Sequence, residues 1–502
     1  MIAPMRWWAL LSLVFALAAA PARAQEEGGG GGTGGAEAPG TEAPPAEEEK
    51  GEERWFAVVG GEVHTGLGEV LRGATVLARN GRIRKVGYDL DLPPDTKTVD
   101  AAGMRVYPGL VAISSQGLIG NASSDIDDTI DPFNPRMILG LAAGITSTGV
   151  SNAAAKLKRF SVEGAQLRER AFATFSWSGN NPSGKRSLRE KFAQTAEYLR
   201  QYRDWEEKVK KQKDLKEPPK RNVDTSVLAV MRGEVLAKFV ANDADDLVGI
   251  ARLSREFGFR PVIEGCIEGW TVADELGRAG AYAIVTPRDR RTKDEQLARP
   301  GGSSIENAAI LHRAGVQVAV VPAQEGVDLG GIVGRDIMHL PVEAAFAVRG
   351  GLPEPAAIES ITIVPARMLG VSHRVGSLEV GKDCDLIVTD GDLLHYQTFV
   401  QYAVVDGRVV YDKEKELFFA HIRPRPGPPE RKVDKGETEP KPADPAAEEG
   451  VEAEKDGTDD DPKDDEPAPK DDKEDDDKKD GDKKDGDGGG RSRGEDDTGE
   501  QP

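Results

Sequence analysis

The sequence predicts an α/β protein that combines a (β/α)8 TIM-like barrel with a small β-sandwich built from both ends of the folded region. The barrel is predicted because short apolar segments alternate with helical patterns over residues 109–370. The sandwich is predicted because short strand patterns separated by tight turns occupy residues 54–108 and return over residues 371–422.

The first part of the sandwich is indicated by strand patterns bounded by turn residues. Residues 75–79 and 83–87 are rich in β-branched side chains and flank Asn80-Gly81, a dipeptide typical of two-residue hairpin turns. The apolar run 55–59 precedes this hairpin, and a further strand pattern at 104–107 follows it. Strands this short and few do not make a stable sheet alone, so we expect partners from elsewhere in the chain.

The barrel region carries apolar strand patterns that alternate with helical ones. The clearest strands are expected at residues 144–150, 237–241, 260–264, 282–285 and 316–321. Between them, residues 187–222 form a long charged stretch, which favours a solvated helix that ends near Pro218-Pro219.

The second part of the sandwich follows two helical patterns. Residues 385–389 predict a strand, and residues 400–411 predict a hairpin with an Asp406-Gly407 turn. We expect these strands to join those of residues 54–108, so that both ends of the folded region meet beside the barrel.

The two ends of the chain are expected to lie outside this fold. Residues 1–24 combine Arg6, an apolar run from Trp7 to Ala20 and a small-x-small cleavage sequence, a pattern typical of a signal peptide. The apolar run is short for a bilayer span, which takes about 20 residues. We therefore expect an exported protein, periplasmic or extracellular, with no membrane span after cleavage. Residues 25–53 predict a disordered linker, and residues 423–502 predict a disordered acidic tail.

Charge and cysteine usage exclude some classes of function. The net charge is −21, but residues 431–502 alone hold 14 basic and 29 acidic side chains, so the folded part is nearly balanced. Without a basic field we expect no nucleic-acid partner. Two cysteines, Cys266 and Cys384, are too few for a disulfide framework, and we expect both to be small buried residues.

The segment from Tyr107 to Gly117 carries the clearest functional signal. Its apolar residues predict a buried parallel strand, which ends in Ser114-Ser115-Gln116, at the end of a barrel where chemistry is located. This junction resembles that of the amidohydrolase superfamily, in which a similar strand leads into a His-x-His pair that binds a catalytic divalent metal. Ser114 and Gln116 stand at the two histidine positions, and Ala112 stands at the usual acidic one.

Further stretches extend the resemblance, which is closest to the imidazolonepropionase-like members of that superfamily. They lie at residues 70–87, 141–149 and 364–411, and the last is similar almost throughout. The resemblance implies the barrel-and-sandwich fold, zinc or another divalent metal, and hydrolysis of carbon–nitrogen bonds other than peptide bonds.

The metal positions that the resemblance implies are not filled. Val240 and Asn242 match the place of one strand-borne histidine, and Gly265 after Ile263-Glu264 matches a second. The aspartate expected near the end of the eighth strand is also missing, because the run there ends in Gln324. Neutral side chains bind divalent metals weakly, and valine and glycine side chains do not bind them. We therefore predict no metal and no cofactor.

The expected ligand-binding residues are the polar ones at the predicted strand ends: Ser114, Gln116, Asn242, Glu264 and Gln324. Glu264 is the candidate for acid–base chemistry or for binding a substrate amine, but it is equally suited to a structural ion pair with Arg260 or Lys238.

Three functions remain open from the sequence. The first is an exported amidohydrolase-like protein that binds a small molecule or a protein without metal catalysis. The second is an active hydrolase of carbon–nitrogen bonds with a non-standard site. The third is a structural assembly subunit, for which a homo-oligomer is one possibility.

Overall fold

The computed structural model describes residues 53–120, 126–212, 215–296, 298–328 and 334–416, all of which belong to one compact unit. The predicted signal peptide (1–24) and acidic tail (423–502) lie outside the described residues, as does the linker (25–53) apart from its last residue. None of the helices in the described part of the chain is both long and apolar enough to span a membrane.

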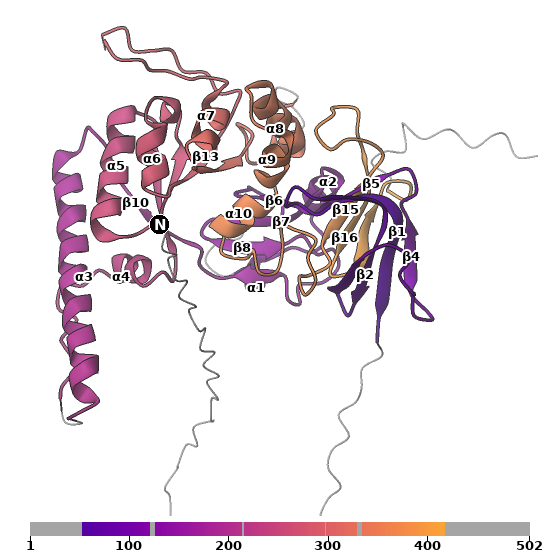
Figure 1. The fold of residues 1–502 in the computed structure, drawn as a ribbon, viewed down its shortest axis with the longest axis horizontal. Coiled ribbons are helices and arrows are strands. Elements are labelled where there is room, and N and C mark those ends of the chain that lie inside the picture. Colours follow the sequence, from indigo (N-terminus) through magenta and orange to yellow (C-terminus); the bar gives the residue numbers. More distant parts are fainter. Residues whose placement is uncertain (1–52, 121–125, 213–214, 297, 329–333, 417–502) are drawn as a thin grey trace, which may run out of the picture. The chain divides into compact units, whose positions relative to one another are not determined.

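Strands from both ends of the folded region share one large sheet (Figure 1). Its eight strands run in the order β17-β16-β15-β5-β1-β2-β3, with β4 beside β1. The central junction is the antiparallel pairing of β15 with β5. The described strands of residues 54–108 and 371–422 form this single sheet, and no second sandwich layer is shown among them. The strands are β1 (Trp55–His64), β2 (Val70–Arg79), β3 (Arg82–Gly87), β4 (Lys97–Asp100), β5 (Arg105–Pro108), β15 (Leu386–Thr389), β16 (Val400–Val405) and β17 (Arg408–Asp412).

Two tight turns that the sequence predicts are present in this sheet. Asn80 and Gly81 connect β2 to β3 with φ angles of 51° and 81°. Asp406 and Gly407 connect β16 to β17 with φ angles of 49° and 63°. Positive φ at both turn residues matches the twist of the flanking strands, which is why asparagine, aspartate and glycine are favoured there.

The chain between β5 and β15 contains parallel strands. One sheet has the order β6-β7-β8-β9 and a second has the order β10-β11-β12-β13-β14. The strands are β6 (Leu110–Ala112), β7 (Ile145–Val150), β8 (Ala153–Lys156), β9 (Gln166–Arg168), β10 (Phe172–Phe175), β11 (Leu236–Ala241), β12 (Pro261–Gly265), β13 (Tyr282–Val285) and β14 (Gln317–Val320).

The predicted eight-stranded barrel is not confirmed in the described residues, because its parallel strands lie in two sheets. On one side, residues 360–361 link the two sheets by backbone hydrogen bonds. Val111 N of β6 donates to Ile361 O at 2.9 Å, and Val320 N of β14 donates to Ser360 O at 3.1 Å. On the other side, the chain reverses at Ser151 (φ 53°), and β8 pairs antiparallel with β7. β8 therefore occupies the edge of β7 that a closed barrel needs for β10.

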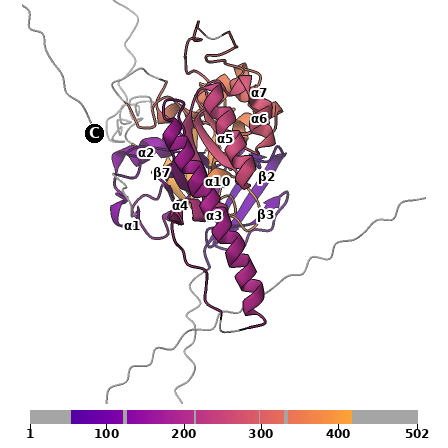
Figure 2. The ribbon, with the colours of Figure 1, turned by 90° about the vertical axis from the view of Figure 1, so that its left-hand side faces the viewer.

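Helices flank these strands, and Figures 1 and 2 show α3 as the long helix beside α5. Helix α5 contacts β12, and α7 and α8 contact β14. The helices are α1 (Ile126–Thr129), α2 (Pro135–Ala142), α3 (Pro182–Val209), α4 (Thr225–Met231), α5 (Ala244–Phe257), α6 (Ala273–Arg278), α7 (Asn307–Arg313), α8 (Leu340–Arg349), α9 (Glu354–Glu359) and α10 (Ile363–Met368).

Helix α3 differs from the solvated helix expected over residues 187–222. It begins earlier, because Asn181 caps it by accepting a hydrogen bond from Gly184 N at 2.8 Å, and it ends before the prolines. One face is also buried: Phe192 has no exposed surface and stacks on Phe259 with ring centroids 4.8 Å apart. Burial of this aromatic side chain adds hydrophobic stabilisation that the charged composition of residues 187–222 does not indicate.

A buried lysine joins β8 to the large sheet. The side chain of Lys156 has no exposed surface, and its Nζ lies 2.8 Å from Asp383 Oδ2, 2.8 Å from Asp385 Oδ2 and 2.5 Å from Asp406 Oδ1. The Asp385 contact has the distance of an ion pair without the alignment of a hydrogen bond. Asp383 and Asp385 precede β15, and Asp406 lies in the β16–β17 turn. One ammonium group therefore links β8 to the large sheet at two places.

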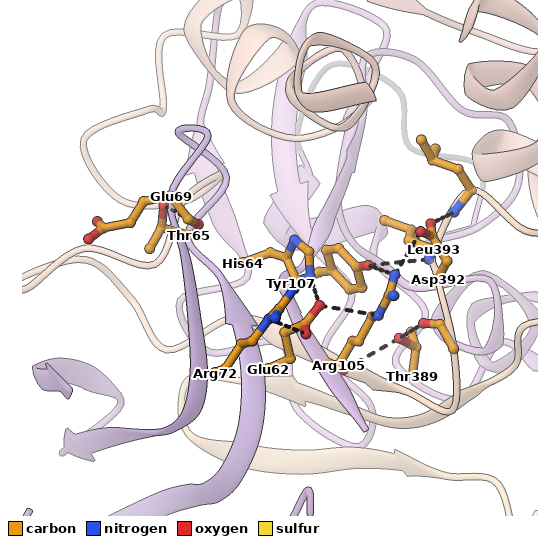
Figure 3. A network of polar contacts seen from close by, with 12 residues as sticks. Glu62, His64, Thr65, Glu69, Arg72, Arg105, Tyr107, Thr389, Asp392 and Leu393 are labelled. Carbon is orange, nitrogen blue, oxygen red and sulfur yellow. Dashed lines mark hydrogen bonds and ion pairs between the residues drawn. The ribbon is translucent and has the colours of Figure 1, made fainter. Parts of the chain in front are cut away.

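A second polar network lies on the large sheet and is drawn in Figure 3. The His64 ring stacks on Tyr107 with centroids 4.3 Å apart, and His64 Nε2 lies 3.1 Å from Glu62 Oε1. Arg105 extends the network, with Nε 3.4 Å from Glu62 Oε1 and Nη1 2.7 Å from Asp392 Oδ2. Burial lowers the pKa of His64, and the neighbouring Glu62 only partly opposes this effect.

The lowered pKa of His64 predicts a loss of stability on the acid side of neutrality. His64 binds a proton more readily in the unfolded chain than in the folded protein. The free energy of unfolding should therefore fall as the pH drops below about 6.5, the ordinary pKa of histidine. We expect His64→Gln to reduce this dependence, measured by urea unfolding between pH 7.5 and 5. His312→Gln, at an exposed residue of α7, is the matched control. Equal pH dependence in both variants would refute the assignment.

Candidate functional site

A cavity of about 580 Å³ lies at the carboxyl ends of the parallel strands, and three of the predicted site residues line it. Gln116 follows β6, Glu264 lies near the end of β12, and Gln324 follows β14. We name it the mouth cavity; its lining is Gln116, Glu264, Gly265, Ile284, Thr286, Val321, Pro322, Ala323, Gln324, Glu325 and Gly326. Ser114 and Asn242, the other two predicted residues, are not part of this lining.

Gln116 reaches the cavity because the segment after β6 is bonded to the segment after β14. Gln116 N donates to Glu325 O at 2.9 Å, and Gln116 forms an isolated parallel bridge with Gly326. Its side-chain Nε2 also lies 3.4 Å from Glu325 Oε2. These contacts bring an amide and a carboxylate to one wall of the cavity.

Glu264 forms an ion pair with Lys238 of β11, which is one of the two partners expected from the sequence. Glu264 Oε2 lies 2.9 Å from Lys238 Nζ, and this ammonium lies 5.5 Å from the centre of the Phe172 ring. The side chains of Glu264 and Lys238 retain 32% and 17% of their exposure, and of the two only Glu264 lines the mouth cavity. Since Lys238 contacts Oε2, Oε1 can accept a hydrogen bond from a ligand.

The side chain of Asn242 lies beside Gly265, which stands at a position that the resemblance assigns to a histidine. Gly265 has a φ of +91°, and a Cβ atom placed on it would lie 2.2 Å from Asn242 Oδ1. The Asn242 side chain therefore occupies the space that any side chain at residue 265 needs. Asn242 Oδ1 and Ser114 Oγ are both buried without a hydrogen-bond partner in the described part of the chain.

The residues present do not fit the divalent metal that the resemblance implies. Val240 has an apolar side chain that is 59% exposed, and Gly265 has neither a ligand atom nor room for one. Within the described ranges, no three histidine, cysteine, aspartate or glutamate side chains are grouped so that they could hold a metal ion. The side chains at these positions therefore lack the donor atoms that a divalent metal needs.

The two cysteines do not supply a nucleophile. Both Cys266 and Cys384 are buried and free, in agreement with the sequence prediction. Burial raises the pKa of the Cys266 thiol to about 12, and burial also raises the pKa of Cys384. Neither thiol is ionised near neutral pH, and the thiolate is the reactive form.

The predicted site lacked two polar residues of the cavity wall, Glu325, which directly follows Gln324, and Thr286. Thr286 directly follows β13, and its hydroxyl group belongs to the same strand-end layer as Glu264. The available signal was a threonine at the end of the apolar run 282–285, in the position where strand-end chemistry is expected.

Comparisons with known proteins identify relatives of this architecture. A family model described as the amidohydrolase family matches residues 285–414. The solved structure of an amidohydrolase from Thermotoga maritima is 25% identical, with a TM-score of 0.56, and the match covers 71% of this chain and all of that one.

Curated relatives match over shorter stretches. Amidohydrolase tasK of Hapsidospora irregularis is 35% identical over 85 residues, which are 17% of this chain and 9% of that protein. The N-acetylglucosamine-6-phosphate deacetylase of Danio rerio is 42% identical over 55 residues, 11% of this chain and 14% of that protein. The matched parts therefore cover less than a sixth of either relative.

Parallel strands with polar residues gathered at their carboxyl ends define an α/β protein of the class that binds or converts small molecules at that edge. Residues 285–414 match the amidohydrolase family, and the fold is similar to that of a solved amidohydrolase.

Proposed function

We propose that this chain is an exported member of the amidohydrolase superfamily that binds a small molecule in the mouth cavity without metal-dependent catalysis. The observation that carries the proposal is the Asn242 side chain in the space beside Gly265, 2.2 Å from where a Cβ atom would lie. An asparagine packed there and a solvent-facing valine at residue 240 replace the imidazole groups on which the superfamily's chemistry depends.

The lining of the cavity favours a polar ligand that carries N–H groups. Glu264 and Glu325 offer carboxylate oxygens, and Gln116 and Gln324 offer amide groups that both donate and accept. A small amine or amide matches this set better than an anion does. The scaffold that presents it is, in this proposal, an opened form of the (β/α)8 barrel, in which Ser360 and Ile361 bond across the place of a missing strand.

Metal content is the first test of this proposal. The mature chain, purified without chelators, should contain far less than one zinc, iron, manganese or nickel atom per chain by elemental analysis. A stoichiometric metal that resists dialysis would contradict the proposal and would favour the catalytic alternative.

That alternative, a hydrolase with a non-standard site, is favoured by one observation: Glu264, a carboxylate of the cavity lining, lies 2.9 Å from Lys238 Nζ and is placed to act as a general acid or base. The binding proposal expects that cyclic amides and N-acylated amines bind but are not turned over, and that Glu264→Gln weakens their affinity. Glu207→Gln, at an exposed residue of α3, is the control. Turnover that Glu264→Gln abolishes and Glu207→Gln preserves would establish the hydrolase instead.

A further inference from the structure

A second cavity of about 610 Å³ lies beyond β13 and is lined by arginine side chains. The segment between β13 and α7 provides most of its wall, and this segment extends past α5, α6 and α7 in Figures 1 and 2. We name it the arginine pocket; its lining includes Arg288, Arg290, Arg291, Arg335, Ile305 and Phe346.

The wall of the arginine pocket is held in place by a buried carboxylate. Glu268 is 4% exposed, and it accepts hydrogen bonds from Gly302 N at 2.9 Å, Ala244 N at 3.1 Å and Arg299 Nη1 at 2.7 Å. Burial by itself would raise the pKa of Glu268, but these donors outweigh burial and lower it. Trp270 Nε1 also donates to Gly302 O at 2.9 Å, so the segment is fixed to the folded body.

Two of the four arginines already have carboxylate partners. Arg288 donates through its backbone N and its Nε to the fully buried Glu343, at 2.9 and 2.7 Å, and its guanidinium lies over the Phe346 ring. Arg291 Nη2 lies 2.8 Å from Asp243 Oδ1. These pairs orient two guanidinium groups and largely balance their charge.

The other two arginines have no such partner in the described part of the chain. Among the described residues, Arg335 Nε is buried without a hydrogen-bond partner, and neither Arg335 nor Arg290 forms an ion pair. Asp289 is the carboxylate of the lining, and its Oδ1 accepts a hydrogen bond from the backbone N of Arg290. A buried donor without an acceptor is unfavourable, and an anion in the pocket would supply the missing acceptor.

We propose that the arginine pocket binds a small organic anion, in which a carboxylate or phosphate group is attached to an apolar group. Arg335 and Arg290 supply the guanidinium forks that match an oxyanion. Ile305, which is 42% exposed, and Phe346 supply the contact with the apolar group. The positive charge of the lining disfavours a metal cation, and the apolar contacts favour an anion that carries an apolar group.

This proposal goes beyond the proposed function of the mouth cavity, because the two linings share no residue. The cavities also differ in charge: the mouth cavity offers carboxylates to an N–H-rich ligand, and the arginine pocket offers guanidinium groups to an anion.

The test is calorimetric titration of the mature chain with benzoate, acetate and inorganic phosphate at constant ionic strength set with chloride. We expect saturable one-to-one binding of benzoate, tighter than that of acetate. Arg335→Gln should raise the dissociation constant roughly tenfold or more, as for the loss of a charge-assisted hydrogen bond. Arg252→Gln, at an exposed residue of α5, should leave it unchanged.

Each other outcome overturns part or all of the proposal. Absence of saturable binding by all three anions, or equal effects of Arg335→Gln and Arg252→Gln, would refute the site. Equal affinity for acetate and benzoate would refute the role of Ile305 and Phe346. Because Glu264→Gln should not change anion binding, failure of the mouth-cavity proposal can be told apart from failure of this one.

Discussion

Replacement of Lys156 by methionine is expected to lower the free energy of unfolding by about 3–5 kcal/mol, the usual cost of removing one partner from a buried ion pair. Methionine keeps much of the volume of the side chain, so the loss comes from charge. Asp383, Asp385 and Asp406 would then share a buried site without the ammonium that lies within 2.8 Å of each.

The ionisation of the cluster supports an effect of this size. Burial opposes the charge of Lys156, but the three aspartates outweigh burial and raise its pKa, so the side chain stays protonated in the folded protein. Burial raises the pKa of Asp385, whereas Lys156 and Lys158 overcome burial at Asp406 and lower its pKa. Without Lys156, Asp406 loses the ammonium group that most strongly opposes the effect of burial on its pKa.

Urea unfolding followed by circular dichroism measures this effect, and Lys158→Met is the matched control. Lys158 lies 2.5 Å from Asp406 Oδ2 but retains 18% of its exposure, so its loss should cost about 1 kcal/mol or less. If Lys156→Met does not fold, Lys156→Met combined with Asp406→Asn removes the carboxylate whose pKa Lys156 lowers and should recover part of the stability. A cost of Lys156→Met no greater than that of Lys158→Met would contradict the buried cluster.

Replacement of Gly265 by alanine is expected to lower the free energy of unfolding by about 2–4 kcal/mol, from two separate causes. The first is backbone strain, because a φ of +91° is unfavourable for a residue with a Cβ atom. The second is the overlap with Asn242 Oδ1, which lies 2.2 Å from the place of that Cβ atom.

Two further variants separate these causes. Gly233→Ala is the matched control for backbone strain, because Gly233 has a φ of +74° and nothing lies within 4 Å of its Cβ position. Gly265→Ala should therefore cost more than Gly233→Ala, and Asn242→Ala should remove the excess in a double-mutant cycle. Equal costs for the two glycines would show that Asn242 does not block residue 265.

The large sheet was predictable because its turns are encoded locally. Asn80-Gly81 and Asp406-Gly407 require positive φ at both positions, and this requirement alone fixes the two hairpins and the strands beside them. Closure of the barrel was not predictable, because it depends on which strand occupies the free edge of β7. The reversal at Ser151 decides this, and serine at a positive φ is no recognised turn signal.

The same distinction applies to the site. That Gln116, Glu264 and Gln324 lie together was predictable because strand ends meet at one edge whatever the details of pairing. The position of the Asn242 side chain beside Gly265 depends on packing between strand ends, which a sequence pattern does not contain. The arginine pocket was missed because its wall is positioned by Glu268, a distant residue whose partners are mostly backbone N–H groups.

The Lys156 cluster also bears on how the protein is made. Lys156 and Asp406 are 250 positions apart, so the ribosome delivers the cation long before its last counter-charge. A nascent chain that has emerged only through β14 contains a lysine whose burial is unfavourable, since none of its three carboxylates has yet been synthesised. Folding of this region is therefore completed only after translation has passed the β16–β17 turn, and a chain that stops short of it is an unfinished domain.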